Sequence, residues 1–389
     1  MTEFLIRHFI KDYKDVDQVS VRTGYGVFAS IVGIFFNVLL FAVKLVVGML
    51  LHSVSVRADA FNNLSDAGSS IISLVGVKMA GRPADRGHPF GHGRMEYIAA
   101  LVVSFMIMEM GFSLLKESIV KIGTPDKLVF QVVSVLILCL SIGIKVWLGL
   151  FNRRLGQRID SKVMMAVFTD SMADVLTTAA TIFSIIFFGV TGINIDAFIG
   201  IGVALVVMWA GFGIARDSLD PLIGEAIDPQ LYHKIKTFVD SYDGILGSHD
   251  LIVHNYGPNR SMATIHAEVP NNVDIEVSHE IIDRIERDSV KELGVFLVIH
   301  MDPIETGNER IHVIQEQINE VLKKLDDRCG IHDLRMVKGV AQTNLIFDMT
   351  VPFDYTEKKQ KLLEADVMKR MKSINGTYNC VINTEFSYM

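Results

Sequence analysis

Long apolar runs alternate with short polar segments through the first half of the chain. Each run is close to the roughly 20 residues that a helix needs to cross a membrane. The pattern predicts an α-helical membrane protein whose six transmembrane helices lie at about 27–51, 57–80, 97–121, 128–151, 163–189 and 193–214.

The pattern changes from Arg216 onward, where apolar runs shorten and charges become frequent. Helix-period segments at 230–239 and 277–290 alternate with strand-period segments at 250–254, 263–269 and 295–300. The resulting order, αββαβ, predicts a small cytosolic α+β domain of the ferredoxin or metallochaperone type.

The αββαβ pattern recurs in the remainder of the chain. GSHDLIV at 247–253 is similar to GIHDLRMV at 330–337, and LVIHMD at 297–302 is similar to CVINTE at 380–385, both at an offset of 83 residues. TIHAEVP at 264–270 matches IFDMTVP at 346–352. The second copy keeps His249 as His332 but replaces three other polar residues: His266 by Asp348, His300 by Asn383 and Asp302 by Glu385. We therefore expect a duplicated domain with a degenerate second copy, although chance similarity over so few positions is the alternative.

These patterns divide the chain into four parts. The predicted parts are a cytosolic N-terminal segment (1–26), a six-helix transmembrane domain (27–215), a metal-binding αββαβ domain (216–303) and its degenerate copy (304–389). The loops at 78–94 and 153–162 are rich in Lys and Arg, so both should face the cytosol, together with both termini.

Composition agrees with a mixed membrane and soluble protein. The 389 residues are 50% hydrophobic, with a mean hydropathy of +0.36, yet 21% are charged. A net charge of −7 argues against nucleic-acid binding. The three cysteines show no CxxC spacing, and no HExxH or phosphate-binding loop is present, so neither a thiolate zinc site nor an enzyme is expected.

Polar residues inside two of the apolar runs are the strongest functional signal. Residues four apart lie on the same face of a helix, and carboxylates inside a membrane are costly enough to suggest a functional site. Two helices could therefore offer four oxygen ligands to a hard divalent cation. The four residues are Asn62, Asp66, Asp170 and Asp174. The alternative is that they cap helices or pair with Lys44 and Arg57.

A second candidate site lies in the loop between the second and third predicted spans. Asp85, His88 and His92 have the spacing DxxHxxxH there. The alternative is a polar cytosolic loop with structural histidines.

The six predicted spans, the NxxxD and DxxxD pairs, the loop HPFGHGRME and the His-rich αββαβ segment together resemble the cation diffusion facilitator family of divalent-metal/proton antiporters. The resemblance covers roughly residues 20–303. It implies a homodimer in the plasma membrane, here expected to be bacterial, that exports a divalent metal in exchange for protons by alternating access.

The intramembrane quartet resembles that of the manganese-exporting branch of the family. Zinc-transporting branches supply His at one or more matching positions, and imidazole suits Zn²⁺, whereas oxygen ligands suit Mn²⁺. Protons would then neutralise the three aspartates and release the metal. The rival interpretations are a Zn²⁺, Fe²⁺ or broad-specificity carrier of the same family and a metal-sensing membrane protein that moves no ions.

The resemblance also implies a cytosolic binuclear centre near the dimer contact, holding Zn²⁺ or Mn²⁺. Its expected ligands are His249, His266, His279, His300 and Asp302. Single histidines on strands are more often ordinary residues than ligands. The same resemblance implies that Asp85, His88 and His92 form a metal site in their loop. It also implies an interlock between Arg94 and Asp220 that stabilises the dimer.

Overall fold

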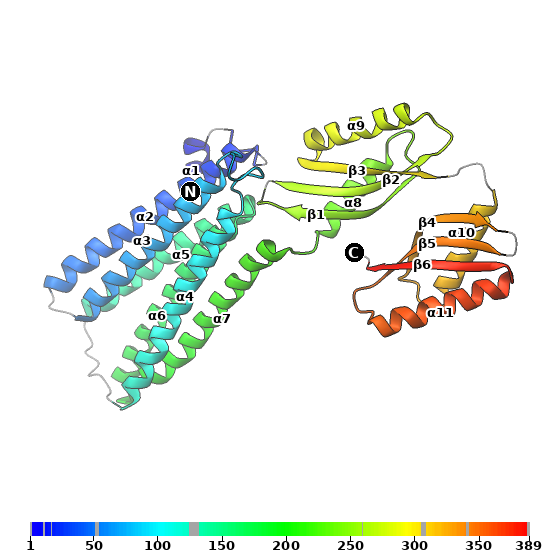
Figure 1. Ribbon diagram of the computed structural model, residues 1–389. Helices are drawn as coiled ribbons and strands as arrows, with labels where there is room; N and C mark the ends of the chain where they lie inside the picture. The colour runs from blue at the N-terminus through cyan, green and yellow to red at the C-terminus, as the bar shows by residue number, and fades with distance from the viewer. Residues whose placement is uncertain are drawn as a thin grey trace. The chain divides into compact units, whose positions relative to one another are not determined.

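The computed structural model describes residues 2–10, 12–16, 18–50, 54–123, 132–258, 260–304, 309–339 and 342–386. The chain forms two compact units (Figure 1). The first comprises Met1–Glu225 with Asn255–Arg260, and the second comprises Ala226–His254 with Ser261–Met389.

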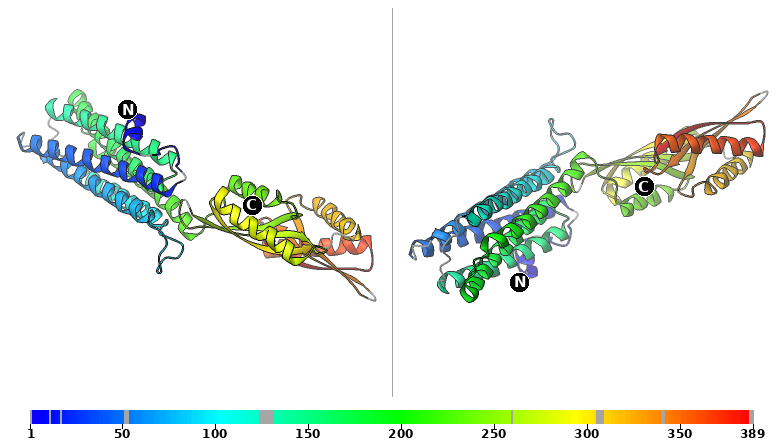
Figure 2. Two further views of the ribbon diagram at one scale, coloured as in Figure 1. Left: turned by 90° about the horizontal axis from the view of Figure 1, so that it is seen from above. Right: turned by 90° about the horizontal axis from the view of Figure 1, so that it is seen from below.

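The first unit is a bundle of long helices that run side by side (Figures 1 and 2). Its helices are α1 (Thr2–Phe9), α2 (Val19–Leu50), α3 (Val54–Ala80), α4 (Met95–Gly123), α5 (Val132–Arg158), α6 (Lys162–Thr191) and α7 (Asp196–Ile223). Large apolar side chains such as Phe35, Phe105, Phe112 and Trp209 are exposed on the bundle surface, as expected of helices that face lipid.

Five of the six predicted spans are confirmed by length and hydropathy, namely those in α2, α4, α5, α6 and α7. The remaining prediction, 57–80, falls in α3, which is 27 residues long but is not among the five in the described residues. Its polar residues, which include Asn62, Asn63 and Asp66, lower its mean hydropathy. The helix that carries half of the predicted quartet is therefore the least apolar of the six.

Small residues allow the helices to pack closely. A Cβ added at Gly76 of α3 would lie 2.2 Å from the Cβ of Ala99 on α4, so only glycine permits this approach. Ser30 on α2 and Ser73 on α3 also share a hydrogen bond of 3.1 Å. Helix α7 continues to Ile223, beyond Arg216 and Asp217, where the apolar run ends. The predicted domain boundary after residue 215 therefore falls inside a helix.

The second unit begins with a module of three strands and two helices. Its elements are α8 (Pro229–Asp240), β1 (Gly247–Asn255), β2 (Ser261–Pro270), α9 (Ile275–Glu292) and β3 (Val295–Ile304). The sheet has the order β1-β2-β3, with β2 parallel to β3. Buried and half-buried residues alternate along β2, and its buried face packs with Ile235, Val239, Ile282 and Ile285 of the two helices. His266 lies on the other face.

A second module with the same element order follows. Its elements are α10 (Glu309–Lys323), β4 (Gly330–Lys338), β5 (Thr343–Val351), α11 (Glu357–Ile374) and β6 (Tyr378–Phe386). Its sheet has the order β4-β5-β6, with β5 parallel to β6. His266 is opposite His300 in the first sheet, and Asp348 is opposite Asn383 in the second. The positions matched by sequence thus take the same register in both modules.

Candidate metal centres

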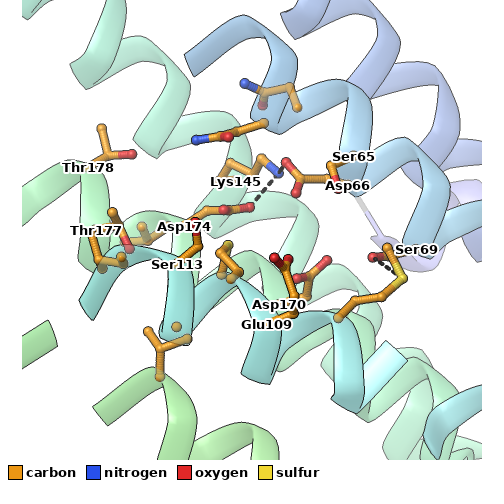
Figure 3. A pocket seen from close by; sticks show the side chains of 18 of the residues that line it. Ser65, Asp66, Ser69, Glu109, Ser113, Lys145, Asp170, Asp174, Thr177 and Thr178 are labelled. Atoms are coloured by element: carbon orange, nitrogen blue, oxygen red, sulfur yellow. Dashed lines mark hydrogen bonds and ion pairs between the residues drawn. The ribbon is translucent and has the colours of Figure 1, made fainter. Parts of the chain in front are cut away.

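A cavity of about 540 Å³ lies within the helix bundle (Figure 3). All four residues of the predicted quartet line it: Asn62 and Asp66 from α3, and Asp170 and Asp174 from α6. Asp66 and Asp170 are buried, whereas Asn62 is exposed. Tertiary packing therefore brings together two helices whose polar pairs lie about a hundred residues apart in sequence.

The structure adds one residue that sequence reasoning missed. Lys145 on α5 places its Nζ 2.6 Å from Asp66 Oδ2 and 2.7 Å from Asp174 Oδ2 (Figure 3). Its side chain is only 4% exposed. A lysine inside a predicted span is as unusual as a carboxylate there, so the rule that singled out the aspartates could also have found Lys145.

The donors around the cavity suit a hard divalent cation. None of the described residues that line it is His or Cys, so the available side-chain ligands are mainly oxygens of Asp, Asn, Glu, Ser and Thr, together with two lysine nitrogens and the sulfurs of Met106 and Met110. The second lysine, Lys44, is buried on α2. The carboxyl groups of Asp66, Glu109, Glu117, Asp170 and Asp174 outnumber the two lysines in this lining. The excess of acidic groups favours binding of a divalent cation.

The three residues of the predicted loop site, Asp85, His88 and His92, also lie close together. Asp85 lies 3.4 Å from a ring nitrogen of His88 and 3.4 Å from one of His92. The backbone N–H groups of His88 and Gly87 donate to Asp85 and hold its pKa below the ordinary value. Nδ1 of His92 lies 3.2 Å from the Pro83 carbonyl oxygen, which leaves Nε2 toward Asp85. Asp85 and His88 are exposed, so the group could bind metal only as an open surface site.

In the second unit, three of the five predicted cytosolic ligands converge. Nδ1 of His266 lies 2.8 Å from Asp302 Oδ2, and Nε2 of His249 lies 3.5 Å from the same oxygen. Asp333, from the second module, joins them, and one ligand atom of each of the four lies within 4.8 Å of the others.

The other two predicted ligands, His279 and His300, have exposed side chains and are not part of this group of four. His300 is beside the cluster, with its Nε2 3.4 Å from Asp302 Oδ1, but its side chain is 68% exposed. His279 is exposed on α9 and is not part of the cluster of four.

The electrostatics of the cluster are set by burial and by its carboxylates. Burial disfavours the charged form of His249, but Asp333, Asp250 and Glu268 outweigh it and raise the pKa of this imidazole. The pKa of Asp333 is lowered, chiefly by His249. Burial raises the pKa of Glu268.

The donor set fits a divalent transition metal. Both ring nitrogens of His249 are buried and have no hydrogen-bond partner, an arrangement that is costly unless a ligand is bound. Two imidazoles and two carboxylates are ligands that Zn²⁺ accepts and that Mn²⁺ tolerates.

Arg94 makes contacts within its own chain that the sequence did not predict. Within one chain its guanidinium donates to the backbone carbonyl of Asn255 at 3.0 and 2.8 Å and lies over the ring of Tyr256, with 4.7 Å between Cζ and the ring centroid. It makes no ion pair with Asp220, which is exposed on α7; both residues are described by the structure. The contact joins the loop before α4 to Asn255 at the end of β1 and to Tyr256 directly after it.

A helical bundle around an acidic cavity, followed by an α+β region, is the arrangement expected of a membrane cation transporter. Residues 30–223 match the cation efflux transmembrane domain, and residues 227–304 match the cation efflux protein cytoplasmic domain. The chain belongs to the cation efflux, or cation diffusion facilitator, family, and it is a transporter and not an enzyme.

Three relatives illustrate the range of similarity. The manganese efflux system protein MneS of Bacillus subtilis is 27% identical over 286 residues, which cover 71% of this chain and 95% of MneS. The uncharacterised transporter MJ0449 of Methanocaldococcus jannaschii is 29% identical over 258 residues, 65% of this chain and 88% of that protein. The cation-efflux pump FieF of Shigella boydii is 26% identical over 266 residues, 68% of this chain and 88% of FieF.

Proposed function

We propose that the protein exports Mn²⁺ from the cytosol in exchange for protons, using the cavity lined by Asn62, Asp66, Asp170 and Asp174 as its transport site. The observation that carries this proposal is the clustering of three aspartates in a cavity whose described lining has no imidazole. Oxygen donors of this kind suit Mn²⁺, whereas Zn²⁺ sites more often include imidazole or thiolate. The similarity to MneS, a manganese efflux protein by name, supports the same choice of metal.

The alternative is a Zn²⁺, Fe²⁺ or broad-specificity efflux carrier of the same family. Relatives at 26–29% identity leave room for a change of metal. The two proposals differ only in the metal that the ligands of the transport site bind best. Transport measured with the metals in direct competition therefore separates them.

Lys145 gives the proposed exchange a physical basis. Its ammonium forms ion pairs with carboxylate oxygens of Asp66 and Asp174. The metal would be coordinated by these same oxygens. Metal binding must therefore displace the ammonium or remove its proton, and metal release restores the ion pairs. The aspartates and Lys145 together hold the protons that are exchanged, and rocking of the helices exposes the cavity to either side in turn.

We further propose the arrangement of the remaining chain. Both termini lie in the cytosol, the segment before residue 27 is a cytosolic lead-in, and the protein acts as a homodimer in the plasma membrane. Residues 216–303 form the cytosolic metal-binding domain, and 304–389 are its degenerate copy. The shared element order and the matched register of Asp348 and Asn383 with His266 and His300 support the duplication.

The test is metal uptake into inside-out vesicles with an imposed proton gradient, comparing Mn²⁺ with Zn²⁺. We expect Mn²⁺ uptake that collapses with the gradient and is lost in Asp66→Ala and Asp174→Ala. Asp217→Asn is the control, because Asp217 is exposed on α7 and is not among the residues that line the cavity. Equal or faster Zn²⁺ uptake would contradict the choice of metal, and full transport by both alanine variants would contradict the site.

A further inference from the structure

The second module brings its own histidine and aspartate to the cytosolic cluster. His332 and Asp333 on β4 correspond in sequence to His249 and Asp250 on β1. The rings of His249 and His332 lie with their centroids 4.3 Å apart. The two modules of one chain therefore meet through equivalent residues.

The contacts between these residues are reciprocal. Nε2 of His249 lies 3.8 Å from Asp333 Oδ2, and Nε2 of His332 lies 3.4 Å from Asp250 Oδ1. Each histidine faces the aspartate of the other module, as in a local two-fold arrangement. Such reciprocity is characteristic of symmetric contacts between two copies of one surface.

A shared backbone feature makes this possible. Consecutive side chains on a regular strand point to opposite faces. Asp250 and Asp333, however, have φ angles of 51° and 53°, in the left-handed region, and the pairing of β4 with β5 is irregular between His332 and Arg335. The distortion lets His and Asp, though adjacent in sequence, approach the same cluster.

The imidazoles at this contact lack the partners that buried polar groups require. His332 is 8% exposed, and neither of its ring nitrogens has a hydrogen-bond partner, as is also true of His249. Carboxylates surround the pair: Asp302 and Asp333 lie beside His249, and Asp250, Asp333 and Asp348 lie beside His332. Unsatisfied nitrogens among acidic oxygens are what a divalent cation would coordinate.

We propose that the two modules share a divalent-metal centre, in which Asp333 of the second module completes the ligand set of His249, His266 and Asp302. His332, packed on His249, supplies a further nitrogen to the same centre. The bound ion joins the second module to the first within one chain, because its ligands come from both. The second module, although it has lost the equivalents of His266 and His300, keeps the residues that face its neighbour. This proposal holds whichever metal the membrane cavity carries.

The test is Zn²⁺ binding to the full-length protein in detergent, measured by competition with a chromophoric chelator. We expect Asp333→Asn to weaken the tightest site about tenfold or more, since loss of a ligand costs at least as much as loss of a residue that orients one. His332→Gln should also weaken it, and His249→Gln should remove it. Asp366→Asn, an exposed charge change on α11 of the same module, is the control and should bind as the wild type does.

The variants are chosen to stay folded. Asparagine tolerates a positive φ angle as well as aspartate does, so Asp333→Asn preserves the backbone of β4. If Asp333→Asn and His332→Gln bind Zn²⁺ with wild-type affinity while His249→Gln does not, the site belongs to the first module alone and the proposal is wrong. Unchanged binding in all the variants would also overturn it. Because the measurement does not involve transport, its failure is distinguishable from a failure of the proposed function.

Discussion

Lys145 and Asp66 join α5 to α3 by an ion pair of 2.6 Å inside the helix bundle. Neither side chain is more than 8% exposed. A buried pair of this kind contributes little net stability, but breaking it leaves an uncompensated charge. The ammonium of Lys145 lies at the carboxylate oxygens that are proposed to bind the metal. A bound metal ion must therefore replace it.

Replacing Lys145 with Met should make the stability of the protein depend on metal. Without the ammonium, Asp66 and Asp174 lose their shared partner, and we expect a loss of about 3–5 kcal/mol in metal-free protein. Added Mn²⁺ should restore much of this loss by binding the freed carboxylates. Thermal unfolding in detergent, with and without Mn²⁺, measures the effect. Lys145→Arg, which keeps the charge, is the control, and an equal Mn²⁺-induced Tm shift in Lys145→Met and the wild type would argue against displacement.

Asn62→His should shift the metal preference of the transporter toward Zn²⁺. The residue lines the cavity, and an imidazole adds a ligand that suits Zn²⁺ better than an amide oxygen does. The Zn²⁺ to Mn²⁺ ratio of uptake into vesicles should rise about tenfold, equivalent to 1.4 kcal/mol. Asn62→Gln retains the amide and serves as the control. An unchanged ratio would show that Asn62 does not set selectivity.

The buried ion pair between Arg22 and Glu96 should be important for the stability of the bundle. Arg22 on α2 contacts both carboxylate oxygens of Glu96 on α4, at 3.1 and 3.0 Å, and also donates to the carbonyls of Ile159 and Asp160. Glu96→Gln should destabilise the protein by about 3–5 kcal/mol, because the guanidinium then has no opposing charge. Thermal unfolding of this variant, compared with the exposed change Glu117→Gln on the same helix, provides the check. Equal stability of the two variants would contradict this role.

Cys380 should report the folding of the second module. The residue is 7% exposed, and burial raises its pKa to about 11 from an ordinary 9.0. Labelling by a thiol reagent at neutral pH should therefore be slow in the folded protein and fast after denaturation. As pH rises above 9, the unfolded chain ionises this thiol first, so the stability of the module should fall between pH 9 and 11. Rapid labelling of a Cys380-only variant at pH 7 would show that this core is open.

Residues whose role depends on neighbours in sequence could be predicted from the sequence. The i, i+4 spacing of Asp170 and Asp174 on an apolar helix places their side chains together through local geometry alone. The loop site of Asp85, His88 and His92 was instead expected from the resemblance to the family. The alternation along β2 likewise predicts which face packs on the helices. The resemblance to the cation diffusion facilitator family followed from these local patterns, and the family comparisons confirm it.

Contacts between distant segments were decided by the tertiary structure. Lys145 meets Asp66 across 79 residues of sequence, and His249 meets His332 across 83. Nothing in local periodicity says which lysine will neutralise a buried aspartate or which two sheets will face each other. These pairings depend on how the helices and modules pack. A buried charge is tolerated only if packing places an opposite charge from another part of the chain beside it. The sequence by itself therefore determined the elements and the kinds of ligand, whereas packing decided which charges meet and how the second module takes part.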